Sequence, residues 1–336
     1  MITDSVELCR VLDARLGAFL VTDDRPATVV EVCLDPPPGR MTIDSHLFPL
    51  EPAAGVEQAF GIIFRHLLDR VGDYLLLHGA ALSDGRNALL IAGPSGAGKT
   101  TLAMALLDRG LRLLGDDMAP LALADGLIHP FHKAPGIRQG AAADLAGQAP
   151  GPLNLEQLPA GRLEHRARPL GGVFFIGAAR ASADPTAPYF FVLTFSGPPR
   201  PEEIATFAAL PGVRLAAEKG WEVVLRIDPR RCTTSAFEAR LAEYQGRLLE
   251  YGTIASVDHG RPGPPRARPL AASRAMLLLA REVQNRRHDG ALAQRAGDGG
   301  WLSCLASALK GVPCWAVETG APAPTAALIE ELFSKS

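Results

Sequence analysis

The sequence has few cysteines, little net charge and no long apolar run. Its five cysteines are odd in number and widely spaced, and none forms a C-x-x-C pair; they are Cys9, Cys33, Cys232, Cys304 and Cys314. A zinc site or a disulfide framework is therefore not expected, and we predict free, buried thiols. Thirty-four Lys and Arg against thirty-six Asp and Glu give a net charge of −2. This balance argues against a nucleic acid or an anionic membrane as a partner.

Signals for export or membrane insertion are also missing. Apolar runs such as residues 190–193 are too short to span a bilayer. The first residues, Met1-Ile2-Thr3-Asp4, lack the basic and apolar regions that begin a secretory signal. Gly (34) and Pro (28) are scattered without the period that collagen requires. With 336 residues, 47% of them hydrophobic, the chain can bury a large core, so we expect a cytoplasmic globular enzyme.

Strand and helix patterns alternate through the middle of the chain, which favours an α/β layered domain. We predict strands over 28–34, 74–77, 88–92, 111–114, 173–176, 189–195, 222–227 and 312–317. We predict helices over 55–70, 99–109, 235–251, 270–287 and 302–310, and a last one from Thr325. The Pro- and Gly-rich stretch 259–269 is typical of a linker. The sequence therefore divides into an α+β segment over 1–70, which could dock a substrate, a core over 71–258, and a linker with a C-terminal segment over 259–336.

A glycine-rich loop carries the clearest chemical signal. Residues 93–100 read GPSGAGKT and fit G-x-x-x-x-G-K-[ST], between a predicted strand and a predicted helix. Glycines let successive backbone N–H groups face one anion, and the helix that follows directs its positive end at the same anion. Lys99 would reach the β- and γ-phosphates, and Thr100 would offer a hydroxyl to Mg²⁺. The alternative is an ordinary turn. We expect nucleotide binding by Gly93, Ser95, Gly96, Ala97, Gly98, Lys99, Thr100 and Thr101.

Two further signals lie near this loop in the sequence. Asp116 and Asp117 directly follow the predicted strand 111–114, where a carboxylate can hold Mg²⁺ or accept a hydroxyl proton. The alternative is a solvated turn, since Gly-Asp-Asp is also good turn chemistry. His78 ends the strand before the loop strand; a lone histidine is more often a surface or satisfied core residue.

Together these three features resemble the catalytic core of the HPr kinase/phosphorylase family. His78-Gly79, the loop 93–100 and Gly115-Asp116-Asp117 occur in the family's order, with fifteen residues from His78 to Gly93 and seventeen from Lys99 to Asp116. The resemblance is strong over about 74–135, weaker over 265–336 and absent over 1–50. It implies an α/β fold with a P-loop nucleotide-binding core, related to that of ATP-dependent phosphoenolpyruvate carboxykinase.

The resemblance also implies an activity. It implies a kinase that uses ATP and Mg²⁺ and transfers a phosphoryl group to a hydroxyl, usually serine, of a peptide or protein substrate. Asp116 would be the base, Asp117 and Thr100 would serve the metal, and His78 would lie by the transferred group. Lys99 and the loop amides would stabilise the transition state. A small-molecule acceptor stays open, as does a homo-oligomer, because members of the family often form one.

The sequence departs from the family after the Asp pair. Bifunctional members carry a glutamate-plus-glycine signature there, whereas residues 130–138 read PFHKAPGIR, with no acid and with two cations, Lys133 and Arg138. Phosphorolysis and HPr itself are therefore in doubt. Lys133 and Arg138 could grip a phosphate or an acidic substrate, or could be ordinary surface charges. Glu156 or Glu164 could replace the lost acid, and nothing in the sequence selects either.

Two rival functions remain at this level. One is a nucleotide-dependent switch that hydrolyses ATP or GTP without an acceptor, although the sequence has neither L-S-G-G-Q nor N-K-x-D. The other is a protein that binds nucleotide without catalysis. Whether phosphate is transferred to an acceptor, to water or to nothing discriminates among the three.

Overall fold

The fold is described from a computed structural model of the chain. The structure describes residues 2–16, 30–34, 39–43, 46–50, 55–132, 136–137, 151–152, 158, 161–177, 188–195, 197–219, 221–244, 247–254, 263–285, 291–297 and 300–335. By backbone packing the chain forms two compact units. Unit 1 comprises Met1–Leu67 and Thr186–Ile254, and unit 2 comprises Leu68–Pro185 and Ala255–Ser336. Residues 186–254, which our division of the sequence places in the 71–258 core, thus group with the N-terminal residues.

The N-terminal part of unit 1 is a small α+β layer. Its strands lie in the order β1-β2-β3-β4, and they are Ile2–Thr3, Val30–Cys33, Arg40–Ile43 and His46–Pro49. Its helices are α1 (Val6–Leu16) and α2 (Gly55–Asp69). Leu8 of α1, Met41 of β3 and Ile62 of α2 share one buried cluster. The helix predicted over 55–70 is therefore present, and its apolar face closes this core.

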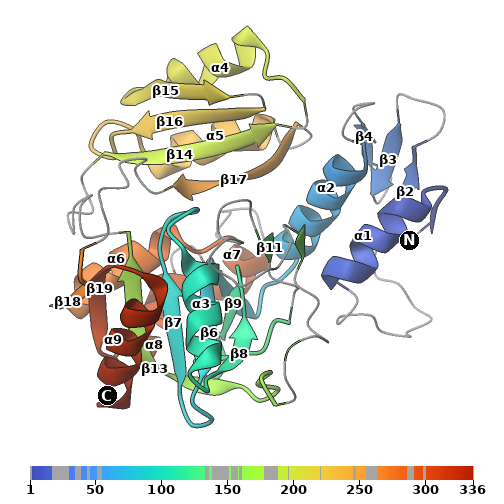
Figure 1. Cartoon of the computed structure of the whole chain (residues 1–336). Coiled ribbons are helices and arrows are strands. Elements are labelled where there is room, and N and C mark those ends of the chain that lie inside the picture. Colours follow the sequence, from blue (N-terminus) through green and yellow to red (C-terminus); the bar gives the residue numbers. More distant parts are fainter. Residues whose placement is uncertain are drawn as a thin grey trace. The chain divides into compact units, whose positions relative to one another are not determined.

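The second part of unit 1 is a module with the topology of a split βαβ fold. Its elements in chain order are β14 (Tyr189–Phe195), α4 (Pro201–Ala208), β15 (Val213–Lys219), β16 (Glu222–Ile227), α5 (Thr234–Glu243) and β17 (Leu248–Ile254). The sheet order is β15-β16-β14-β17, with every neighbouring pair antiparallel. This is the order of ferredoxin-like βαββαβ domains. We call residues 188–254 the inserted module, because they interrupt the chain of unit 2 (Figure 1).

The inserted module closes a core of its own. Phe191, Leu193 and Phe195 of β14 alternate with outward-facing residues and pack against Phe207 of α4 and Phe237 of α5. Figure 1 shows both helices beside this sheet. The self-contained core explains why these residues do not extend the sheet of unit 2.

One helix predicted in this module is wrong in its second half. The prediction runs over 235–251, whereas α5 spans Thr234–Glu243 and is followed by β17. The hydroxyl of Thr233 caps the start of α5 by accepting a hydrogen bond from the N–H of Ala236. Tyr251 then lies on a strand and stacks on Phe191 of β14. Pairing with β14, which is distant in sequence, overrides the local helical pattern.

Unit 2 is built on a mixed sheet. Among the residues described, it contains nine strands: β5 (Tyr74–Leu77), β6 (Gly79–Ser83), β7 (Ala88–Ala92), β8 (Arg112–Gly115), β9 (Ala119–Ala122), β10 (Leu127–Ile128), β13 (Arg168–Ile176), β18 (Arg266–Leu270) and β19 (Cys314–Glu318). Strand β13 runs parallel to β7 and to β19, and the other pairs are antiparallel. Residues 266–270, predicted to be linker, instead form β18 against β19. A separate pair joins β11 (Gly136–Ile137) to β12 (Gly151–Pro152).

Helices cover both faces of this sheet. On one face lie α3 (Lys99–Asp108) and α9 (Pro322–Ser334), which bury Leu89 and Ile91 of β7. On the other lie α6 (Ala272–Arg281) and α8 (Gly300–Ala308), which bury Leu90 together with α7 (Ala291–Ala296). Burial of both faces explains why β7 is a continuous apolar run rather than an alternating one. Helices on both faces of a mixed sheet show that unit 2 is a mixed α/β structure.

Both connections to the inserted module leave unit 2 from one end of this sheet. Ile176, the last residue of β13, and Ala267 of β18 both pair with Val317 of β19. The chain therefore departs on one side of β19 and returns on the other. Among the described helices, none is long and apolar enough to cross a membrane.

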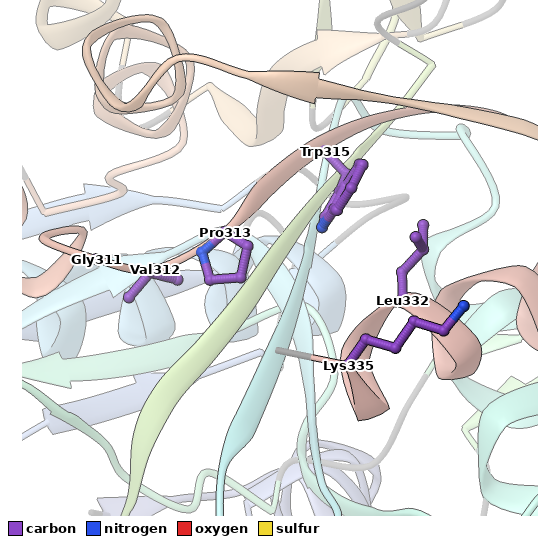
Figure 2. A pocket seen from close by; sticks show the side chains of 6 residues that line it. All are labelled: Gly311, Val312, Pro313, Trp315, Leu332 and Lys335. Atoms are coloured by element: carbon purple, nitrogen blue, oxygen red, sulfur yellow. The ribbon is translucent and has the colours of Figure 1, made fainter.

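A cavity of about 480 Å³ lies at the opposite end of β19 (Figure 2). It is lined by Gly311, Val312, Pro313, Trp315, Leu332 and Lys335. Because residues 311–313 precede β19, and β19 runs parallel to β13 and hence to β7, this cavity is far from the loop that follows β7. It does not coincide with the residues predicted to be functional.

Candidate functional site

The sheet brings the three predicted motifs to one end. Strand β6 is antiparallel to both β7 and β8, so β7 and β8 run in the same direction and end together. The loop 93–98 follows β7, Asp116 follows β8, and His78 directly precedes β6. Gly79 pairs with Ala92, the last residue of β7. We call this group, namely His78, residues 93–98, Asp116 and Asp117, the glycine-loop rim.

The loop curls because its glycines adopt conformations that other residues avoid. Gly93, Gly96 and Gly98 have φ of 153°, 77° and 92°, and Gly98 is the N-cap of α3. A Cβ at Gly93 would collide with the carbonyl oxygen of Ile176, whereas a Cβ at Gly96 or Gly98 would meet nothing within 4 Å. Gly93 thus lets β7 end close to β13, and the other two glycines leave the loop's outer face open.

Lys99 folds back over the loop. Its Nζ donates hydrogen bonds to the carbonyl oxygens of Gly93 at 2.7 Å and Pro94 at 3.1 Å, and the residue is only 6% exposed. In the described residues, no side chain caps the N-terminus of α3. The N-terminus of that helix and the Lys99 ammonium both lie at this loop, and helix N-terminal N–H groups beside a cation are suited to bind an anion.

Thr100 and Asp116 meet at the rim. The Thr100 hydroxyl donates to Oδ2 of Asp116 at 2.9 Å, and Asp116 is 1% exposed. Asp117 has a φ of 64°, so the chain turns sharply after β8. Gly115 permits this turn, because a Cβ there would lie 2.5 Å from the Met118 carbonyl oxygen. The contact joins α3 to the end of β8 and places the Thr100 hydroxyl beside the predicted base.

The oxygen donors here fit Mg²⁺. The Thr100 hydroxyl and the carboxylates of Asp116 and Asp117 are hard oxygen donors, and those of Thr100 and Asp116 lie within hydrogen-bond distance of each other. Mg²⁺ is commonly held by one or two carboxylates together with phosphate oxygens and water. In the described part of the chain, no group of three or more His, Cys, Asp or Glu is placed to hold a metal ion alone.

His78 is half-buried and held by residues from far along the chain. The backbone N–H of His78 donates to the carbonyl oxygen of Glu282 at 2.7 Å. The side-chain Nε2 of Gln284 lies 3.3 Å from the ring nitrogen Nδ1 of His78. Gly79 is needed next to it, since a Cβ would lie 2.7 Å from the Ile91 carbonyl oxygen. The sequence prediction identified His78 but missed Gln284, because residues 270–287 have a helical pattern and only a long-range contact reveals the role of Gln284.

Glu164, one of two acids considered as a replacement for the family glutamate, is occupied elsewhere. It is 3% exposed, accepts a hydrogen bond from Arg168 at 2.8 Å and lies 3.7 Å from Arg112. Burial raises the pKa of its carboxyl, but hydrogen bonds from Arg168 and from the N–H of Arg166 outweigh it, so the pKa lies below its usual value. Glu164 is therefore a charged structural residue that ties residues 164–168 to β8.

The remaining predicted residues are placed as follows. Ser95 and Ala97 lie in the loop, with Ser95 buried, and Thr101 lies in the first turn of α3. Lys133, Arg138 and Glu156 lie outside the described residues. All five cysteines are free, but only Cys232 and Cys314 are buried, and Cys9 is exposed.

In comparisons with known proteins, no family model and no curated protein matches the chain. What the chain does must therefore be inferred from the chemistry of the glycine-loop rim.

Proposed function

We propose that the chain is an ATP-dependent, HPr-kinase-like kinase with a P-loop nucleotide-binding core, which transfers the γ-phosphoryl group to a hydroxyl. The serine of a peptide or protein is the first acceptor to test. The observation that carries the proposal is the meeting of two elements at one rim: Lys99 folded over the glycine loop, and Thr100 hydrogen-bonded to Asp116. The order and spacing of the motifs, which resemble the HPr kinase/phosphorylase family, support it.

In this proposal each residue has one task. ATP with Mg²⁺ supplies the phosphoryl group and neutralises part of its charge, with Thr100 and Asp117 on the metal side. The loop amides and Lys99 hold the β- and γ-phosphate oxygens. Asp116 accepts the proton of the acceptor hydroxyl as the hydroxyl oxygen bonds to the γ-phosphorus, while the bond from that phosphorus to the β–γ bridging oxygen breaks and ADP leaves. His78 lies beside the transferred group.

The test is transfer of label from γ-labelled ATP in the presence of Mg²⁺ and an extract of the source cell. Small molecules, peptides and proteins are separated afterwards, and Lys99→Ala is the control. We expect label in one fraction with the unaltered chain and none with Lys99→Ala. Label released only as inorganic phosphate would overturn the kinase and favour the hydrolytic switch.

Two isosteric variants distinguish the proposed roles of Asp116 and Asp117. Because Asp116 is proposed as the base, Asp116→Asn should lower transfer by at least about 100-fold while Mg²⁺-dependent nucleotide binding persists. Asp117→Asn should instead weaken that binding. Since Thr100 contacts Asp116, the reverse pattern would exchange the two roles.

A further inference from the structure

The segment Glu282–Asn285 is clamped onto the strand that leads into the rim. Besides the bond from His78 to Glu282, the N–H of Gln284 donates to the carbonyl oxygen of Leu76 at 2.8 Å. Val283 pairs antiparallel with Leu77. These residues directly follow α6 and form turns on either side of the single bridge residue Val283.

The side chain of Asn285 holds the segment 282–285 in place. It is 1% exposed, and its Oδ1 accepts the N–H of Leu76 at 3.1 Å. Its Nδ2 donates to the carbonyl oxygens of Val71 at 2.7 Å and Tyr74 at 2.9 Å. The oxygen and both N–H groups of this buried amide are thus used, two of the three bonds going to β5 and one to Val71 before it. Gln284 is thus held beside His78 by its own backbone bond to Leu76 and by the bonds of its neighbours Glu282 and Asn285.

The orientation of the Gln284 amide bears on which ring nitrogen of His78 carries the proton. In the structure the amide nitrogen Nε2 of Gln284 faces Nδ1 of His78 at 3.3 Å, and an amide nitrogen can only donate a hydrogen bond. With the amide in this orientation, Nδ1 is the acceptor. In a neutral imidazole with an accepting Nδ1, the proton is on Nε2.

We propose that Gln284 is a positioning residue that holds His78 as the Nε2–H tautomer, so that His78 presents an N–H donor to an oxyanion at the glycine-loop rim. That the oxyanion is a phosphoryl group rests on the proposed function; the tautomer does not. In this state Nε2 has no lone pair with which to take a proton. The proton of the acceptor hydroxyl is therefore left to an aspartate, and His78 orients and stabilises the anion.

The test reads the tautomer directly. The full chain is labelled with ¹⁵N-histidine, and two-bond ¹H–¹⁵N correlations show which ring nitrogen is protonated; the His78 signals are assigned by their loss in His78→Gln. We expect the Nε2–H pattern in the unaltered chain. Gln284→Met keeps the side-chain length but removes the donor, so both tautomers should appear. Gln284→Glu should move the proton to Nδ1, because a carboxylate accepts.

Gln294→Met is the matched control, since it makes the same chemical change on α7. It should leave the His78 pattern unchanged. An Nδ1–H pattern in the unaltered chain, or a pattern that Gln284→Met does not alter, would overturn the inference. If Gln284→Met does not fold, Gln284→Asn tests the same contact with an amide that is one methylene shorter.

Activity is a second readout with a separate meaning. Gln284→Met should lower kcat about ten-fold with KM for ATP unchanged, the size expected from one misplaced hydrogen bond. If the tautomer depends on Gln284 but no acceptor is ever labelled, the proposed function fails and the positioning role stands. If phosphoryl transfer occurs but the His78 tautomer is the same with and without the Gln284 amide, only the positioning role fails.

Discussion

Two glycines of the loop are required for different physical reasons. At Gly93 the neighbouring backbone of Ile176 leaves no room for a Cβ, and at Gly96 the surroundings are open but φ is 77°. In the sequence both positions are simply glycine, so the two reasons cannot be told apart. Only the structure separates a close approach between strands from a left-handed turn.

Alanine at these positions should therefore have unequal costs. We expect Gly93→Ala to lower the free energy of unfolding by about 3 kcal/mol, because β7 and β13 must separate. Gly96→Ala should cost about 1 kcal/mol, the penalty of a left-handed non-glycine residue. Gly252→Ala in β17, where a Cβ meets nothing within 4 Å and φ is not positive, is the control. Urea unfolding measures all three, and equal costs at Gly93 and Gly96 would contradict the steric argument.

Asn285 offers a second test at the scale of one residue. Asn285→Asp changes one atom of similar size, but it replaces the donor to Val71 and Tyr74 with an oxygen that faces two carbonyl oxygens. We expect the variant to lose about 3 kcal/mol of stability at pH 7, since two buried acceptors lose their donor. Thermal unfolding checks this, with Asn87→Asp at a half-buried position in the turn before β7 as a comparison. An unchanged melting temperature would mean that the clamp does not depend on this side chain.

Among the elements, those whose contacts are local could be predicted from the sequence. Strand 88–92, the loop and the helix from Lys99 are confirmed because an apolar run, glycines and a helical pattern follow one another directly. Strands β17 and β18 could not be predicted from the sequence. Strand β17 depends on pairing with β14, which is distant in sequence, and β18 lies in a proline-rich stretch and depends on pairing with β19. The same holds within the site: Lys99 and Asp116 stand in recognisable motifs, whereas Gln284 reaches His78 across 206 residues.

Helix α4 and the residue directly before strand β17 are joined by a largely buried ion pair. Glu203 accepts hydrogen bonds from Arg247 at 2.9 and 3.1 Å and from the N–H of Arg200 at 2.7 Å. Burial raises the pKa of this carboxyl, but the bonds from Arg247 and Arg200 outweigh it and hold the pKa below its usual value. Both partners are largely buried, so breaking the pair leaves an uncompensated charge.

This pair should make the stability of the inserted module depend on pH. Because the folded pKa is below the unfolded one, the contribution of Glu203 is complete above the ordinary carboxyl pKa and is lost as pH falls from about 5 through the folded pKa. We expect Glu203→Gln to cost about 3 kcal/mol at pH 7 and progressively less in acid. Urea unfolding of both proteins from pH 7 to pH 3 measures the difference. A difference that stays constant over this range would show that charge is not the cause.

For the whole molecule, the sheet of unit 2 is continuous without the inserted module. Ile176 and Ala267 both pair with Val317, so they lie about 10 Å apart, two strand spacings. We therefore expect a chain in which residues 178–262 are replaced by a Gly-Ser linker of about eight residues to keep the sheet folded. Hydrogen exchange at the amides of Leu90, Ile91 and Phe174 should stay slow. Fast exchange there would show that the module is needed for the core of unit 2.

The order of synthesis has a consequence for how this sheet forms. Strand β19 lies between β13 and β18, yet it is made after both of them and after the whole inserted module. Until residues 314–318 exist, residues 173–176 of β13 lack their partner on the side away from β7, and the segment that contacts His78 has only just been added. The inserted module, whose contacts span fewer than seventy residues, can close its core first. The nascent chain thus carries a finished module beside an open sheet, and that open side of β13 is where early aggregation or chaperone binding should occur.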